Sequence, residues 1–199
     1  MHRRWLPLLV LAACGTQPVP RPNSPTERAA EERTPVSDVA SATAKRALFD
    51  GRTLAGWDGD PRYWSVEDGA IVGRSTEANP LASTTYLLWR GGEVADFELA
   101  FDFQLVGGNS GLQFRSRDQG GWRVAGYQAD LEDGPNWTGC LYEQDGRGVM
   151  VGRGEDARFT SAGKTSTRFA DATELLGRVK RGEWNRYVVR ARGRVLETE

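Results

Sequence analysis

Histidine is nearly absent from this chain, whose 199 residues include only His2, close to the amino terminus. If the segment around His2 is removed as a signal, Ser-His-Asp and Cys-His catalysis are excluded, together with every zinc site that needs histidine ligands. Acid and base chemistry must then fall to carboxylates, tyrosine, lysine or groups assisted by arginine. Any metal must be held by oxygen atoms.

Cysteine is also scarce, and the first of the two cysteines follows a segment typical of a signal peptide. Residues 1–4 are basic, Trp5 to Leu11 form a short apolar core, and Leu11-Ala12-Ala13 leads to Cys14 with small residues. This run resembles the lipobox of bacterial lipoproteins. The resemblance implies cleavage after residue 13 and a diacylglycerol and N-acyl chain on Cys14, which would anchor the protein to a membrane. An ordinary signal peptide with a chance cysteine is the alternative.

Acylation of Cys14 leaves Cys140 without an intramolecular partner, so we expect no disulfide and a small buried thiol.

The net charge of the chain gives no indication of a nucleic-acid partner. The formal charge is −1 for the whole chain and becomes −3 without residues 1–13, which carry two arginines and no acid. A slightly acidic chain without a basic patch predicts no nucleic-acid partner.

Residues 14–45 are rich in proline, serine, threonine and charge, and they contain almost no large apolar side chains. Such a segment cannot bury enough surface to offset its ordering entropy, so we interpret it as a tether. The folded domain is predicted to span residues 46–199, a length that suits one domain with a sizeable core.

Short alternating segments dominate that domain. A hairpin is predicted at residues 63–73 around the turn Asp68-Gly69, and Phe97 to Leu105 shows the clearest alternation, which predicts a central strand. Further strands are expected at 85–90, 111–116, 123–132, 139–144 and 184–197, with one short helix at 172–179. The pattern predicts an all-β, antiparallel two-sheet sandwich.

Between Gly107 and Gly148, polar side chains gather on one side of the predicted sheet. Because successive strand residues alternate faces, Gln113 and Arg115 should point together, as should Gln128, Asp130 and Glu132. Amides, arginine and carboxylates hydrogen-bond sugar hydroxyls in fixed directions. We therefore expect a carbohydrate-binding face.

Several ordered motifs resemble the 3-keto-disaccharide hydrolase domain family, whose fold is a jelly-roll sandwich of the concanavalin A-like lectin/glucanase type. They are Leu48-Phe49-Asp50-Gly51, Trp64-Ser65-Val66-Glu67-Asp68-Gly69, Asp96-Phe97-Glu98-Leu99, Gly108-Asn109-Ser110-Gly111-Leu112-Gln113-Phe114-Arg115, Gly126-Tyr127-Gln128-Ala129-Asp130 and Gly139-Cys140-Leu141-Tyr142-Glu143. The resemblance covers about residue 46 to the end. The family continues beyond the strand that follows Trp184, whereas this sequence ends at Glu199, so we expect the sandwich to lack terminal strands and to be less stable.

The resemblance implies cleavage of glycosides whose sugar carries a ketone at C3. That ketone acidifies the C2 proton, so a base can trigger loss of the C1 leaving group, and the resulting enone can then take up water. Our hypothesis makes Asp130 the base, with Glu132 and Glu143 as alternates, and gives Arg115 the stabilisation of the enolate. Substrate-orienting roles are assigned by the same hypothesis to Gln113, Gln128, Glu132, Tyr142 and, by stacking on the sugar, Trp137.

A non-catalytic lectin-like lipoprotein is the alternative, because the same sandwich serves both purposes. A divalent cation held by oxygen ligands is a further possibility, with Asp130, Glu132, Asp133, Asn136 and Asp145 as its ligands. The residue after Cys14 is glycine rather than the aspartate associated with inner-membrane retention. The expected location is therefore the bacterial outer membrane, facing the periplasm or the exterior.

Overall fold

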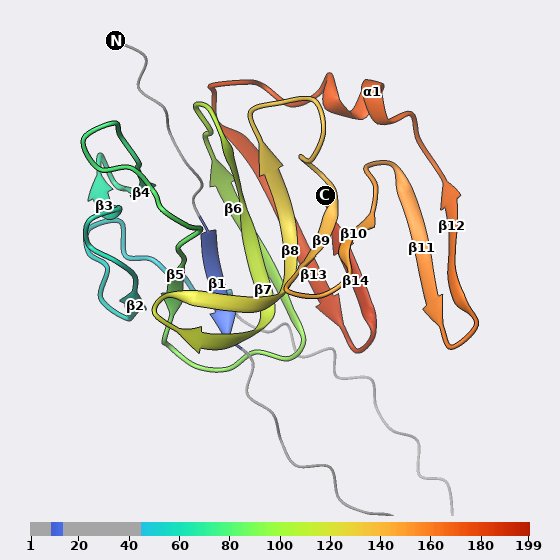
Figure 1. The fold of residues 1–199 in the computed structure, drawn as a ribbon, viewed down its shortest axis with the longest axis horizontal. Helices are drawn as coiled ribbons and strands as arrows, with labels where there is room; N and C mark the ends of the chain where they lie inside the picture. The colour runs from blue at the N-terminus through green and yellow to red at the C-terminus, as the bar shows by residue number, and fades with distance from the viewer. Residues whose placement is uncertain (1–8, 14–44) are drawn as a thin grey trace, which may run out of the picture.

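The computed structural model describes residues 9–13 and 45–199, and the described chain is built almost entirely of β-strands (Figure 1). Cys14 and the predicted tether lie outside the described residues, so their lipidation and conformation stay predictions. Within the described residues, no helix is long and apolar enough to cross a membrane.

The larger sheet contains seven strands in the order β10-β9-β8-β7-β1-β5-β2. Its long central hairpin joins β7 to β8, two strands whose alternating residues form both a core face and a polar face. The strands are β1 (Leu9–Ala13), β2 (Trp57–Asp58), β5 (Leu87–Trp89), β7 (Asn109–Gly120), β8 (Arg123–Glu132), β9 (Leu141–Gln144) and β10 (Gly148–Val151).

A second sheet, ordered β14-β13-β6, contributes the other wall of the core. It consists of β6 (Phe97–Phe103), β13 (Asn185–Arg192) and β14 (Val195–Thr198), all antiparallel. Leu112, Phe114 and Ala129 of the larger sheet join Tyr187 and Val189 of β13 in one buried cluster. The predicted two-sheet sandwich is therefore confirmed.

The strand with the clearest alternation occupies a different place from the one predicted. β6 pairs with β13 and, among the described strands, with no other, so it is an edge strand and the prediction of a central strand is wrong. β13 lies in the middle of this sheet. Alternation reports that one face is buried, and an edge strand that packs on the opposite sheet meets that condition equally well.

The strand β1 falls within the segment predicted to be a signal peptide. It lies between β5 and β7 and is parallel to both, with Val10 opposite Leu87 and Leu112. The other strand pairs are antiparallel, as predicted for the sandwich. In this structure the apolar segment is thus paired within the larger sheet.

Three smaller elements complete the fold. The predicted hairpin is confirmed as β3 (Trp64–Glu67) and β4 (Ala70–Gly73), and its turn holds Asp68 and Gly69 at φ of 49° and 77°. The hairpin of β11 (Glu155–Thr160) and β12 (Gly163–Arg168) projects from the sandwich beyond β10 (Figure 1). The predicted helix is a single turn, α1 (Ala172–Leu176), capped by the side chain of Asp171.

Candidate functional site

The outer face of β7 and β8 carries a cluster of buried polar side chains. Gln113 pairs in register with Gln128, and Gly111 pairs with Asp130. The two amides and the carboxylate alternate with Leu112, Phe114 and Ala129, which belong to the core. The exposed fractions of Gln113, Gln128 and Asp130 are only 0%, 7% and 4%. These three polar side chains are therefore out of contact with bulk water.

A chain of hydrogen bonds joins these side chains. The hydroxyl of Ser116 donates to Oε1 of Gln113 at 2.8 Å, and Nε2 of Gln113 donates to Oε1 of Gln128 at 3.2 Å. Nε2 of Gln128 then donates to Oδ1 of Asp130. Every bond runs toward the carboxylate, so each amide is oriented by its neighbours and the last donor is fixed on Asp130. We call these four residues the amide chain.

Asp130 has the protonation behaviour expected of a general base. Burial raises the pKa of its carboxyl group to about 7, against the opposing hydrogen bond from Gln128 and with a smaller contribution from the charge of Glu132. A base works best when its pKa lies near the ambient pH, because it is then both ionised and able to hold a proton. Asp130 can therefore exchange protons at neutral pH.

Tyr86, which the sequence analysis did not assign to the site, is buried next to the turn between β7 and β8. Its side chain is 2% exposed, and this burial is the main reason that the pKa of its phenol is raised above the ordinary value. The predicted strand at 85–90 contained this tyrosine, but nothing in the sequence indicated that it would lie beside β7. The position comes from long-range packing, in which the backbone N–H of Tyr86 donates to the carbonyl of Trp122.

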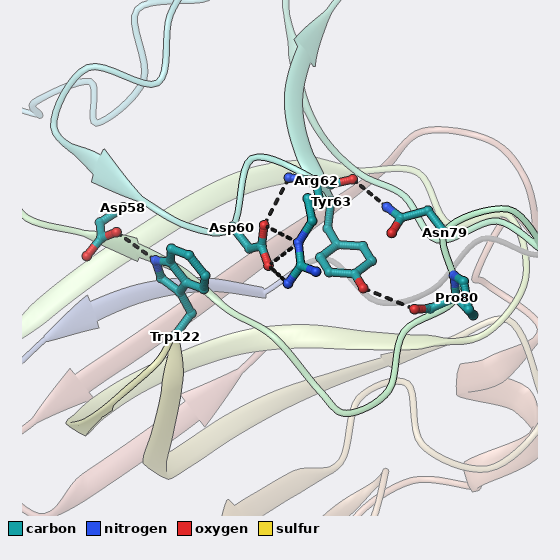
Figure 2. A network of polar contacts seen from close by, with 7 residues as sticks. All are labelled: Asp58, Asp60, Arg62, Tyr63, Asn79, Pro80 and Trp122. Carbon is teal, nitrogen blue, oxygen red and sulfur yellow. Dashed lines mark hydrogen bonds and ion pairs between the residues drawn. The ribbon is translucent and has the colours of Figure 1, made fainter.

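Trp122 lies in the turn between β7 and β8, and this turn folds back toward β5. Its indole Nε1 donates to Oδ1 of Asp58 at 2.7 Å (Figure 2). Asp58 also accepts from Arg90, which contacts Asp118 of β7 at 2.7 Å. Together these contacts fasten the distal part of the β7–β8 hairpin to β2 and β5, next to Tyr86.

Arg115 does not share a face with Gln113, contrary to the alternation predicted for this strand. The β7–β8 register shifts between Phe114 and Arg117, and Arg115 adopts a φ of 47° within this irregularity. Its guanidinium group donates to the carbonyl of Ala95 at 2.9 Å and contacts Asp96 at 3.0 Å, near the start of β6. Ser116 takes the place beside Gln113 that alternation assigned to Arg115. The geometry gives no support to a role of Arg115 opposite Asp130.

Glu143 also lies apart from Asp130. In the β8–β9 register, Tyr142 pairs with Gln128, whereas Glu143 pairs with Tyr127 on the opposite face. Its carboxylate contacts Nε of Arg147 at 2.5 Å, and this hydrogen bond, before all other influences, lowers the pKa of Glu143. The structure therefore brings Tyr142 to the amide chain and keeps Glu143 ionised and engaged elsewhere.

Glu132 is the last residue of β8, and Trp137 belongs to the loop that follows this strand. The carboxylate of Glu132 accepts from the backbone N–H groups of Asn136 at 2.8 Å and Trp137 at 3.1 Å. The Trp137 side chain is 39% exposed, so its predicted stacking on a sugar stays a prediction. Glu132 lies close enough to Asp130 to influence its pKa, but its own oxygen is committed to holding the loop.

The predicted oxygen ligands for a cation do not fit a metal centre. Glu132 binds its own loop, and the carboxylate of Asp133 accepts from the N–H of Gly107 at 2.7 Å. Among residues 45–199, no three acidic, cysteine or histidine side chains converge in a metal-binding cluster. We derive no chemical step through a cation.

One known protein family matches most of the chain. The family model of a 3-keto-alpha-glucoside-1,2-lyase-like domain matches residues 44–198. No curated protein and no solved structure shows a significant match. The matched region contains every strand of the two sheets except β1, together with the entire amide chain. The protein therefore belongs to the 3-keto-alpha-glucoside-1,2-lyase-like domain family, a carbohydrate-related family with a concanavalin A-like fold.

Proposed function

We propose that this domain cleaves 3-keto-glycosides by elimination, with Asp130 removing the proton from C2 of the sugar. The observation that carries this proposal is the buried carboxyl group with a pKa of about 7 on the polar face of β8. The ketone at C3 acidifies the neighbouring C–H bond, so a single well-placed base suffices to begin the reaction.

The number of carboxylates in the amide chain also supports elimination. Direct glycoside displacement uses two carboxyl groups that flank the scissile bond. Asp130 is the one carboxylate in the amide chain, because Glu143 lies on the other face and Glu132 is bound within its loop. One base fits proton abstraction better than it fits a two-carboxylate displacement.

Gln113 and Gln128 have supporting roles in this proposal. Gln128 orients the carboxylate of Asp130 and Gln113 orients Gln128, while Tyr142 borders the same face and is available to bind hydroxyl groups. Because Asp130 is 4% exposed, sugar entry requires the covering segments to move. Addition of water to the enone product is the second proposed step and gives net hydrolysis.

The test uses the full chain with a 3-keto-glucoside and its unoxidised parent in heavy water. We expect only the keto sugar to release its aglycone and to give a hydrated product with deuterium at C2. Mass spectrometry would resolve the enone from this hydrate. Release without prior C2 exchange in recovered substrate is also compatible, provided that the C2-deuterated substrate reacts more slowly. Binding of both sugars without turnover would instead indicate a lectin.

We further propose that the domain acts while anchored to the bacterial cell envelope, at the outer membrane, through an acylated Cys14. Support comes from the apolar segment and small residues that precede this cysteine. Metabolic labelling with an alkyne fatty acid should mark the wild-type chain and leave Cys14→Ser unlabelled. Equal labelling of both would remove the anchor from the proposal, and fractionation of the labelled cells would test the membrane assignment.

A further inference from the structure

The β3–β4 hairpin carries a pocket that takes no part in the proposed elimination. The pocket has a volume of about 210 Å³ and is partly open to solvent. Its lining includes Arg62, Tyr63, Arg74, Thr76 and Asn79, and none of the described residues that line it is acidic. The hairpin lies at one end of the sandwich and the β11–β12 hairpin at the other (Figure 1). No residue of the amide chain lines the pocket, so the two are separate.

Arg62 is held at this pocket by a buried carboxylate. The chain turns at Asp60, whose carbonyl accepts the N–H groups of Tyr63 at 3.0 Å and Trp64 at 3.1 Å. Nε and Nη2 of Arg62 donate to the carboxylate of Asp60 at 3.0 Å and 2.5 Å (Figure 2). Asp60 is 3% exposed, so one edge of the guanidinium group is fixed in position. Nη1, on the other edge, makes no hydrogen bond with the described residues and is available as a donor.

Asn79 gives the pocket an acceptor with a fixed orientation. Its Nδ2 donates to the carbonyl of Arg62 at 2.7 Å (Figure 2), and its backbone N–H donates to Oγ1 of Thr76 at 3.1 Å. Because the amide nitrogen is bound in this way, Oδ1 is the atom left to accept a hydrogen bond from a ligand. The hydroxyl of Thr76 accepts that N–H and keeps its own hydrogen to donate. Donors and an acceptor are therefore presented together.

Charge and size favour a small neutral ligand. Both arginines of the pocket are already paired, since Arg62 contacts Asp60 and Arg74 contacts Glu67, each at 2.5 Å. An anion would gain little from guanidinium groups whose charge is already compensated. The volume of about 210 Å³ is smaller than the roughly 300–1,000 Å³ of sites for drug-sized ligands, so the pocket suits a single ring.

We propose that this pocket binds one ring of a neutral carbohydrate, at a site separate from the amide chain. Nη1 of Arg62 donates to a sugar hydroxyl oxygen, and Oδ1 of Asn79 accepts a hydroxyl hydrogen. Pro61 and the ring of Tyr63, which also line the pocket, provide an apolar wall for the C–H bonds of the sugar. The site is independent of the proposed elimination, because it binds an unoxidised sugar and needs no proton transfer to Asp130.

The test titrates the full chain with methyl glucoside and follows binding by saturation-transfer NMR. Arg62→Lys keeps a cation for Asp60 but lacks the Nη1 donors, and Thr76→Val removes one hydroxyl at similar size. We expect the Kd to rise about 10-fold in Arg62→Lys and about 5-fold in Thr76→Val, as for the loss of one or two hydrogen bonds. Absence of wild-type binding at millimolar sugar, or wild-type affinity in both variants, would overturn the proposal.

Two further variants locate the bound sugar. Arg186→Lys is the matched control, because Arg186 pairs with Asp102 at 3.1 Å and does not line the pocket, and it should retain the wild-type Kd. Asp130→Asn should also retain it, whereas its turnover of a 3-keto-glucoside tests the elimination, so the two proposals fail separately. Binding that is lost in Asp130→Asn and kept in Arg62→Lys would assign the sugar to the amide chain and overturn the pocket.

Sodium glucuronate tests the choice of a neutral ligand. It should bind with a Kd close to that of methyl glucoside, because Asp60 and Glu67 already compensate the two arginines. A preference for glucuronate of more than about 10-fold would overturn the assignment to a neutral sugar. Thermal melting of the variants checks the fold. If Arg62→Lys melts early, Thr76→Val decides the outcome, since the backbone bonds between Thr76 and Asn79 remain in it.

Discussion

The two faces of the larger sheet shift the pKa values of their carboxyl groups in opposite directions. Asp130 and Glu143 lie on the paired strands β8 and β9, but Asp130 is buried beside neutral amides and Glu143 contacts Arg147. Burial raises the pKa of the first carboxyl group, and the arginine lowers that of the second. The comparison shows that proton affinity depends on which face a residue occupies and on its partner, and only weakly on residue type.

Removal of the Asp130 carboxyl group, whose pKa is raised, should have the largest effect on turnover. Asp130→Asn keeps the size of the side chain but cannot accept the C2 proton, so we expect turnover of a 3-keto-glucoside to fall about 1000-fold. In the wild type, kcat/KM should rise with pH through about 7, because Asp130 must lose its proton to act as a base. Steady-state kinetics across this pH range measure both effects.

Asp102→Asn is the matched control for that experiment. Asp102 lies on the outer face of β6, where it contacts Arg186 at 3.1 Å, and the same loss of a carboxylate there should leave turnover unchanged. A wild-type rate in Asp130→Asn would refute the role of Asp130 as base. A pH profile without a rise near neutrality would show that another group limits the reaction.

Asp130→Asn should also stabilise the folded protein at neutral and alkaline pH, but not at acidic pH. A carboxyl group whose folded pKa is raised binds more protons in the folded state than in the unfolded state, so the free energy of unfolding falls as pH rises from about 4 to about 7. Asp130→Asn removes this loss, so we expect a gain on the order of 4 kcal/mol at pH 8 and almost none at pH 4. Urea unfolding at both pH values provides the measurement, and a gain of equal size at pH 4 would contradict the ionisation argument.

A substitution at Gly126 of β8 should disrupt the buried polar face, because a side chain there would overlap with Ser116. Gly126 has a φ of 154°, and a Cβ atom there would lie 2.6 Å from Cα of Ser116 and 2.4 Å from its hydroxyl oxygen. We expect Gly126→Ala to lower the free energy of unfolding by about 1–3 kcal/mol through this overlap. Thermal melting measures the change, with Gly163→Ala as the comparison, because φ is also positive there but no atom lies within 4 Å. Similar losses in both would assign the effect to backbone strain alone.

The smallest effect is expected on the other face. Glu143→Gln removes the ion pair with Arg147 but leaves a side chain of similar size, so we expect a loss of about 0.2–1 kcal/mol. Turnover should fall far less than in Asp130→Asn. A reduction of comparable size would mean that the two faces do not differ in function as their electrostatics indicate, and the comparison would fail.

Much of the fold could be predicted because it depends on local pattern. Alternation from residue 123 to 132 predicted β8 over the same residues as the structure, and the Asp68-Gly69 turn predicted the hairpin of β3 and β4. The same alternation predicted that Gln128 and Asp130 would share a face. The pairing of Gln113 with Gln128 could not be predicted in this way, since strand register depends on contacts across the sheet.

The misplaced residues trace to one local irregularity and one choice of register. The irregularity after Phe114 turned Arg115 away, and no residue in the sequence marks it, because Arg115 is not a glycine and its positive φ is maintained by the contacts of its guanidinium group. Glu143 was separated from Asp130 because Tyr142, rather than Glu143, lies opposite Gln128. A register shift of one residue would have reversed the two.

The amino-acid sequence alone was enough to predict the β-rich sandwich, the family and the collection of amides and carboxylates on two strands, because all three depend on residue order and period. Long-range packing fixes which carboxylate is buried, the burial of Tyr86 beside the β7–β8 turn, and the engagement of Arg115 with Ala95. These outcomes depend on desolvation and on contacts between residues distant in the chain. The composition of the buried polar face was therefore predicted from the sequence, while the raised pKa of Asp130 results from packing.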